Sequence, residues 1–186
     1  MRIVYYKDSM IEKTYLPASW LDSRLVVNKS PIAQYGIFAT QNIKQGEILI
    51  RWGGEIFTIQ QVLDGATDED TACQIDDEHY IAFAKGHGQD ADDFMNHSCD
   101  PNTWMEDEVT ISARRDIQAG EEITADYALW VAEDAEVLIP NCQCKTSLCR
   151  QRIMGDDWKL KSVQDRFRGH FPPYLDRRIS AHRNEH

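Results

Sequence analysis

Long hydrophobic runs are missing from this chain of 186 residues. No apolar stretch approaches the roughly 18 residues that a membrane-spanning helix needs, and residues 1–8 reach charged side chains too early for the core of a signal peptide. A tract of basic residues that could act as a localisation signal is missing as well. We therefore expect no membrane partner and a cytoplasmic location by default, and the sequence leaves nuclear or host-cell targeting open.

Basic residues are scarce in the middle of the chain. Between residues 64 and 108 fourteen Asp or Glu stand against one basic residue, Lys85, and the whole chain has a net charge of −11. Such an acidic surface argues against direct contact with nucleic-acid phosphates, whereas it would steer a basic polypeptide toward the protein. A solvated surface that only serves solubility explains the sequence equally well.

Cysteines are few, and their odd number, five, does not suit a disulfide framework. Three of them, Cys142, Cys144 and Cys149, form a CxCx4C pattern in a polar loop. This pattern indicates a zinc site, because zinc takes four soft or borderline ligands in a tetrahedron and one tight loop can supply three thiolates. The fourth ligand must come from elsewhere in the chain. We interpret Cys73 as a small buried hydrophobic residue.

Short segments of β type dominate, and the length suits one buried core. Five segments are rich in branched or aromatic residues and are bounded by turn residues, which predicts strands: residues 24–27, 36–39, 47–52, 55–59 and 109–113. The pattern also predicts a short helix that begins in residues 59–63 and a longer one over 157–168. The prolines of residues 171–175 should end the longer helix.

Two stretches of the chain echo each other, residues 42–48 and residues 116–123. Each contains a glycine, Gly46 or Gly120, immediately before a run that reads as a strand. Glycine readily adopts the positive φ that such a turn requires. We therefore expect two similar turn–strand units.

Three segments in this order and spacing resemble the SET-domain protein-lysine methyltransferases that carry a cysteine-rich, zinc-binding post-SET segment. They are residues 96–102 (NHSCDPN), 120–127 (GEEITADY) and 142–149 (CQCKTSLC). The resemblance covers residues 24–155. It implies a mostly β fold with short helices, in which several small sheets surround a pseudoknot-like C-terminal crossing. The implied division is an N-terminal extension (1–23), a SET domain (24–130), a post-SET zinc segment (131–155) and a C-terminal helix and tail (156–186).

The resemblance also implies roles for individual residues. Tyr127 matches the catalytic tyrosine, and Asn96 and His97 match the pair that holds S-adenosyl-L-methionine by side chain and by backbone. Cys99 would complete the zinc tetrahedron as the fourth ligand. Residues 34–36 lie at the glycine-x-glycine cofactor loop of the family. The three predicted backbone contacts there are Gln34, Tyr35 and Gly36, with Gln34 in the place of the first glycine.

Other positions depart from the family pattern. Asp93 replaces an arginine, Trp52 replaces a tyrosine of the lysine channel, and Ala125 replaces an aromatic residue. We predict a substrate channel lined by Trp52, Met105 and Ala125. Because Ala125 should widen this channel and Trp52 should narrow it, the sequence leaves open whether one, two or three methyl groups are transferred.

The predicted function is N-methylation of lysine side chains in a basic protein, with S-adenosyl-L-methionine as methyl donor and a structural zinc ion. The substrate could be a histone-like protein, a ribosomal protein or a host protein. The alternative is a catalytically weak SET-like module that only binds basic peptides. A hydrolase with Cys99 as nucleophile and His97 as base is a third reading, and it conflicts with Cys99 as a zinc ligand. The oligomeric state stays open, and the C-terminal tail either forms a wall of the peptide groove or only closes the core.

Overall fold

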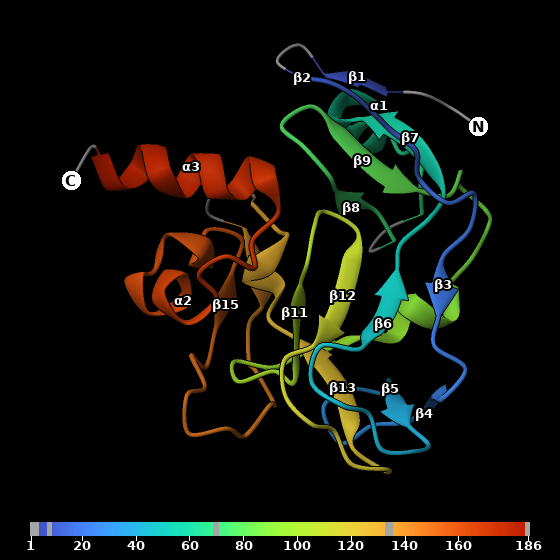
Figure 1. Ribbon diagram of the computed structural model, residues 1–186, viewed down its shortest axis with the longest axis vertical. Helices are drawn as coiled ribbons and strands as arrows, with labels where there is room; N and C mark the ends of the chain where they lie inside the picture. The colour runs from blue at the N-terminus through green and yellow to red at the C-terminus, as the bar shows by residue number, and fades with distance from the viewer. Residues whose placement is uncertain (1–3, 7–8, 69–70, 133–135, 185–186) are drawn as a thin grey trace.

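The computed structural model describes residues 4–6, 9–68, 71–132 and 136–184 (Figure 1). Within them the strands form five small sheets and the helices are short. In spatial order the sheets are β1 (Val4–Tyr6) and β2 (Ser9–Lys13); β10 (Asn96–His97), β13 (Glu122–Ala125), β5 (Tyr35–Ala39) and β4 (Leu25–Lys29); β11 (Thr103–Met105), β12 (Thr110–Ala113), β6 (Ile48–Arg51) and β3 (Trp20–Leu21); β7 (Glu55–Thr58), β9 (His79–Ala82) and β8 (Cys73–Gln74); and β14 (Val137–Ile139) and β15 (Ile153–Met154). The mostly β fold that the sequence predicted is confirmed.

The five predicted strands correspond to β4, β5, β6, β7 and β12, each displaced by one or two residues at one or both ends. The predicted short helix is α1 (Ile59–Leu63). It begins with a capping box, in which the side chains of Thr58 and Gln61 each accept a hydrogen bond from the other residue's backbone amide. Local sequence signals therefore position these elements.

The two similar turn–strand units lie against each other. Ile43 and Ile117 are bridge partners, and each backbone amide donates to the other's carbonyl at 2.9 Å. Both glycines adopt the predicted positive φ, 83° at Gly46 and 89° at Gly120. Because both isoleucines are buried, the echo in the sequence marks a pair of turns that close the core together.

Two segments distant in the sequence meet in a parallel pair at the centre of the molecule. In this pair β10 lies beside β13, with Asn96 opposite Thr124 and His97 opposite Ala125. On its other side β13 pairs with β5 in antiparallel fashion. This sheet therefore brings the 34–36, 96–102 and 120–127 segments to one place.

The C-terminal segment differs from the single helix that the sequence predicted over residues 157–168. It contains a 3-10 turn, η3 (Asp157–Lys159), and a separate helix, α2 (Lys161–Arg166), with Leu160 extended between them at ψ 123°. The Gln164 side chain donates to the carbonyls of Trp158 and Lys159, which replaces helical hydrogen bonds lost at the break. Leu160 is thereby left 42% exposed.

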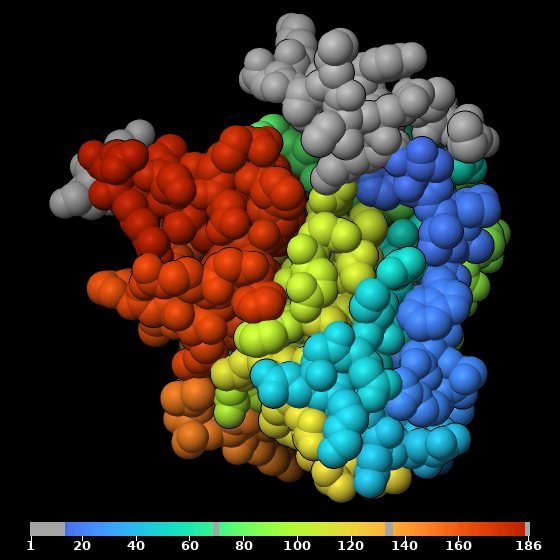
Figure 2. Space-filling view, in the orientation of Figure 1, coloured from blue at the N-terminus to red at the C-terminus, as the bar shows by residue number. Residues whose placement is uncertain are grey.

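The prolines that end the predicted helix also begin another one. Helix α3 (Pro173–Asn184) starts at Pro173, where proline is well suited because the first helical residue needs no amide donor. Figures 1 and 2 show α2 and α3, orange to red, as one block beside the strands. No helix among the described residues is long and apolar enough to cross a membrane.

The predicted N-terminal extension, residues 1–23, contains β3. This strand pairs with β6, with Trp20 opposite Arg51 and Leu21 opposite Ile50, so part of the extension is built into a core sheet. The division of the chain into four segments stays a prediction.

Candidate functional site

Tyr127 lies where β13 ends and a 3-10 turn, η2 (Tyr127–Leu129), begins. Asp126 precedes it as a fully buried N-cap whose side chain accepts from the Ala128 amide at 3.2 Å. The Tyr127 hydroxyl donates to the Met95 carbonyl at 2.9 Å. Its position is therefore set at both ends of the side chain, by the cap and by this hydrogen bond.

His97 is buried next to Tyr127, with ring centroids 5.2 Å apart. Burial lowers the pKa of His97 to about 4, so the ring is neutral at neutral pH. Its Nδ1 accepts from the Tyr127 backbone amide at 3.2 Å, which leaves the proton on Nε2. Nε2 lies 3.2 Å from Cys99 Sγ and therefore donates to that sulfur. His97 thus connects the Tyr127 backbone to the cysteines.

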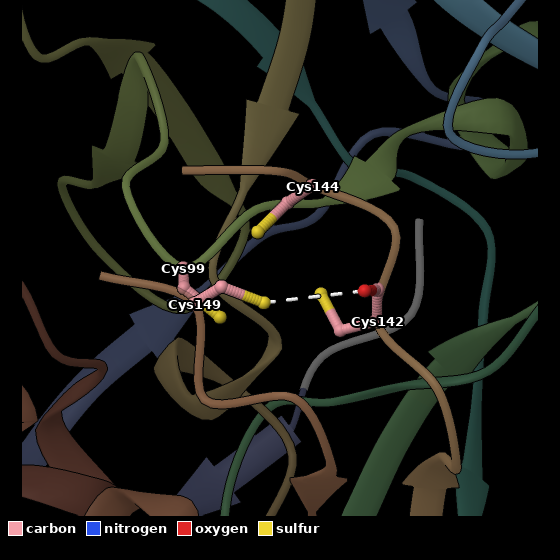
Figure 3. Close-up of side chains that lie close together, drawn as sticks. All are labelled: Cys99, Cys142, Cys144 and Cys149. Carbon is pink, nitrogen blue, oxygen red and sulfur yellow. Dashed lines mark hydrogen bonds between the residues drawn. The ribbon is translucent and has the colours of Figure 1, made fainter. Parts of the chain in front are cut away.

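Four cysteines converge on one point (Figure 3). The sulfur atoms of Cys99, Cys142, Cys144 and Cys149 all lie within 4.8 Å of one another. In a tetrahedron with zinc–sulfur bonds of about 2.3 Å the sulfurs would be about 3.8 Å apart, so a small contraction would close such a site. The donor set fits zinc, and all four predicted ligands are brought together. Cys73 is buried elsewhere, in the main core.

The cysteine loop is tied to the neighbourhood of Tyr127 by Arg150, which directly follows Cys149. The Arg150 guanidinium binds both carboxylate oxygens of Asp126, at 2.6 and 2.7 Å, and Asp157 at 2.8 Å. Its backbone amide donates to Cys99 Sγ at 3.3 Å. A fork-shaped guanidinium can serve several acceptors in one plane, and here it joins the cysteine loop, the residue before Tyr127 and the C-terminal segment.

The predicted cofactor residues form a second cluster. The Asn96 side-chain amide donates to the Tyr35 carbonyl at 2.8 Å and to Glu122 Oε1 at 2.6 Å. A Cβ added to Gly36 would lie 2.1 Å from Glu122 Oε1 and 2.8 Å from Asn96 Nδ2. Gly36 is therefore required by the close approach of these two side chains. Gln34 and Tyr35 are exposed beside it.

Both clusters border one large cavity of about 1510 Å³. Its described lining includes the predicted residues Gln34, Tyr35, Asn96, His97, Tyr127 and Trp52. Met105 and Ala125 are buried in the main core and are not among the described lining residues, so their assignment to the substrate channel stays a prediction. The cavity is larger than the roughly 300–1,000 Å³ of a typical ligand pocket, which leaves room for a cofactor and a side chain together.

Carboxylates line part of this cavity: Asp68, Asp90, Asp92 and Asp93. Burial raises the pKa of Asp93 to about 6, so Asp93 is mostly ionised at pH 7. Asp92 is buried, and its Oδ1 has no hydrogen-bond partner among the described residues. Lys85 is the basic residue of the described lining. This part of the cavity therefore favours a cationic group.

Other residues of the acidic stretch serve the fold. Asp76 accepts from the amides of Glu78 and His79, and Asp77 pairs with two arginines of α3. Asp68 accepts from the amides of Gly86 and Gly88. Glu69 and Asp70 lie outside the described residues. Acidic composition by itself therefore overstated the surface available to a partner.

Sequence reasoning missed four residues of this site: Asp126, Arg150, Glu122 and Trp130. Asp126 and Glu122 lie inside the GEEITADY segment, and Arg150 directly follows the last cysteine, so their neighbours in the motifs were the available signal. Trp130 lines the cavity three residues after Tyr127, and no motif covers it. Its role could be found only from the packing of its ring.

Comparisons with known proteins agree with this arrangement. The family model described as "SET domain" matches residues 34–128. The "Putative histone-lysine N-methyltransferase 1" of Plasmodium falciparum is 31% identical over 164 residues, which cover 80% of this chain and 2% of that protein. The "Histone-lysine N-methyltransferase set1" of Dictyostelium discoideum is 32% identical over 146 residues, 70% of this chain and 9% of that protein. The chain thus spans less than a tenth of either relative.

A solved structure has a similar fold. It is the methyltransferase domain of the human "Histone-lysine N-methyltransferase SETMAR", with a TM-score of 0.54 over 73% of this chain and 60% of that one. Its sequence identity to this chain is 19%, so this likeness concerns the fold alone.

Proposed function

Because this chain belongs to the SET domain family, we propose that it transfers methyl groups from S-adenosyl-L-methionine to lysine side chains of a basic protein. The observation that carries the proposal is that Tyr127, Asn96 and His97 border one cavity. The names of the relatives, which are histone-lysine methyltransferases, support the same reaction.

Asn96, the His97 backbone and residues 34–36 are the groups that would hold the cofactor. When bound, S-adenosyl-L-methionine supplies an electrophilic methyl group. The Tyr127 hydroxyl gives its proton to the Met95 carbonyl, so its oxygen is left to accept a hydrogen bond from the substrate amine. This hydrogen bond would orient the lone pair of the amine, and such positioning is the main requirement of a transfer between two bound groups.

The cysteine cluster would hold one zinc ion, and four thiolates leave no open coordination position. The ion would therefore be structural and would keep the cysteine loop against Cys99. With Cys99 committed as a ligand, a hydrolase that uses Cys99 as its nucleophile is disfavoured. Zinc content of the purified protein tests this part of the proposal.

The Tyr127 assignment is tested with radiolabelled S-adenosyl-L-methionine and a panel of basic proteins, followed by mass spectrometry of the labelled lysines. We expect Tyr127→Phe to fold normally and to lose at least about tenfold in methyl transfer, since single positioned catalytic groups contribute factors of about 10²–10³. Tyr15→Phe is the matched control, because the Tyr15 hydroxyl donates to Glu108 and Tyr15 is not in the described lining of the cavity. Wild-type transfer by Tyr127→Phe would refute the assignment. Peptide binding without any transfer would favour the weak SET-like module.

The cavity carboxylates support a basic substrate. We expect the double change Asp90→Asn and Asp93→Asn to raise KM for a basic peptide more than it lowers kcat, and to reduce the dependence of KM on salt. Glu78→Gln, an exposed acid of the same stretch outside the described lining, is the control. The contribution of Asp93 should fade below about pH 6, where burial keeps its carboxyl protonated beside Asp90, Asp92 and His87. Equal KM for basic and acidic lysine peptides would contradict this part.

The location of the protein follows from its substrate. A histone substrate requires access to chromatin, whereas the cytoplasmic location that the sequence predicts requires another basic protein. The labelled protein in the panel experiment distinguishes these two cases.

A further inference from the structure

Trp130 lies between the other two aromatic rings that line the same part of the cavity. Its ring centroid is 5.1 Å from that of Trp52 in an edge-to-face contact, and 5.4 Å from that of Tyr127 at a tilt of 50°. All three residues line the cavity. The indole of Trp130 is therefore beside the hydroxyl-bearing ring that we assign to the reacting amine.

This position bears on the width of the cavity at Tyr127. The sequence suggested a wide site because Ala125 is small, but Ala125 is buried in the core and is not among the described lining residues. Next to Tyr127 the lining contains the larger indole of Trp130. The two opposed effects that the sequence left unresolved are thus replaced by two tryptophans on the same side.

We propose that Trp130 is a specificity-determining wall that limits how many methyl groups the accepted lysine can carry, so that the protein stops short of trimethyl-lysine. The inference rests on the proposed methyl transfer and deepens it. Each added methyl group needs further room beside Tyr127, and one methylene more or less in an apolar pocket changes discrimination by about 10- to 200-fold. A rigid indole would therefore exclude the largest forms of the amine.

The indole cannot retract, because the backbone around it is held from two sides. The Trp130 amide donates to the Tyr127 carbonyl at 3.2 Å. The Trp130 carbonyl accepts from the hydroxyl of Tyr174 in α3 at 2.6 Å, and Tyr174 is itself buried. Arg178 of α3 donates to the Ala132 carbonyl at 3.3 Å. The C-terminal helix thus positions this wall.

Little space is available behind the ring. A small hollow of about 40 Å³ lies beside Trp130, Ala72 and Ala132. A hollow of this size holds a water molecule or two but not an indole. The ring would have to displace packed residues to widen the cavity.

The test uses the full chain with purified core histones as the probe and measures mono-, di- and trimethyl-lysine by mass spectrometry. We expect wild-type protein to yield mono- or dimethyl-lysine and Trp130→Ala to raise the ratio of trimethyl- to monomethyl-lysine at least about tenfold. Trp130→Phe should raise the ratio less. Tyr174→Phe keeps the ring of Tyr174 and removes only its hydrogen bond to Trp130, so it should move the ratio in the same direction with a smaller effect.

Trp104→Ala is the matched control. Trp104 stacks on His170 outside the described lining of the cavity, so its loss should leave the product ratio unchanged even where total activity falls. A product ratio that is unchanged in all three test variants, with active wild-type protein, overturns the role of Trp130 and leaves the proposed function intact. If Trp130→Ala fails to fold, Trp130→Phe and Tyr174→Phe decide by the same ratio. Wild-type protein that transfers no methyl group to any basic protein overturns the proposed function, and this inference with it.

Discussion

Two consecutive segments dock against the same β core in physically different ways. Residues 136–155 contain the cysteine loop, and residues 156–184 contain η3, α2 and α3. The first segment shares with Cys99 a small buried cluster of three residues, Cys99, Cys142 and Ile153. The second segment adds seven buried side chains to the main core: Trp158, Val163, Phe167, Phe171, Tyr174, Leu175 and Ile179.

The difference shows what each segment depends on. Four thiolates and the Arg150 ion pairs hold the first segment, so its docking should depend on a metal and on one guanidinium. Apolar burial, at about 1.5–3 kcal/mol for each large side chain, holds the second. Both segments contact the residues around Tyr127, and the site therefore depends on a ligand-dependent support and on a ligand-independent one.

Removing the metal should produce the largest effect and separate the two segments. We expect Cys149→Ser, or treatment with a strong chelator, to expose residues 136–155 to hydrogen exchange while residues 156–184 stay protected, because structural zinc contributes about 10–16 kcal/mol of apparent binding free energy in small domains. Cofactor affinity should fall as well. Mass spectrometry of the exchanged peptides reads both segments in one sample.

Cys73→Ala is the control for this experiment, since Cys73 is buried outside the cluster, and it should keep one zinc ion per chain. Equal loss of protection in both segments would contradict the contrast. Wild-type protein that contains no zinc after purification without chelator would end the metal assignment.

Breaking the link between the segments should have the next largest effect. We expect Arg150→Ala to lower the free energy of unfolding by about 3–5 kcal/mol, because it leaves the buried carboxylate of Asp126 without its partner. Urea unfolding measures the loss. Arg150→Lys keeps the charge but cannot form the same fork, so it should lie between wild type and Arg150→Ala. A loss below about 1 kcal/mol for Arg150→Ala would mean that Asp126 is adequately solvated without Arg150.

A cavity in the C-terminal segment should come next and should spare the metal. We expect Leu175→Ala, at a fully buried position of α3, to cost about 2–5 kcal/mol of unfolding free energy while zinc content stays at one ion per chain. Leu148→Ala is the matched change in the cysteine loop. Because Leu148 is 44% exposed, it should change stability by less than about 0.5 kcal/mol. A similar cost for both leucines would remove the contrast.

The smallest effect should come from the exposed ion pairs of α3. Asp77 pairs with Arg177 and Arg178 at 3.0 and 2.8 Å, and exposed pairs contribute about 0.2–1 kcal/mol. We therefore expect Asp77→Asn to lower the midpoint of thermal unfolding slightly at low salt, with the difference shrinking as salt rises. A large loss that is independent of salt would show that charge, rather than apolar burial, docks this segment.

The sequence by itself determined the parts that depend on short stretches of chain. The strand segments, the capped helix at 59–63 and the two glycine turns follow from the local conformational preferences of the residues. The three motifs also identified the residues that border the cavity and the four cysteines, because ligand spacing within a loop and a tyrosine at a strand end are local features. Such signals need no knowledge of which distant residues are neighbours.

Only the tertiary structure decided the rest. It divided the predicted 157–168 helix at Leu160, where Gln164 supplies the lost hydrogen bonds, and it started a new helix at Pro173. It assigned Asp76 and Asp77 to the fold and Asp90 and Asp93 to the cavity. It also brought the ring of Trp130 between Trp52 and Tyr127. The physical reason is that the neighbours of a buried ring or charge come from segments far apart in the chain, and only the packing of these segments selects them.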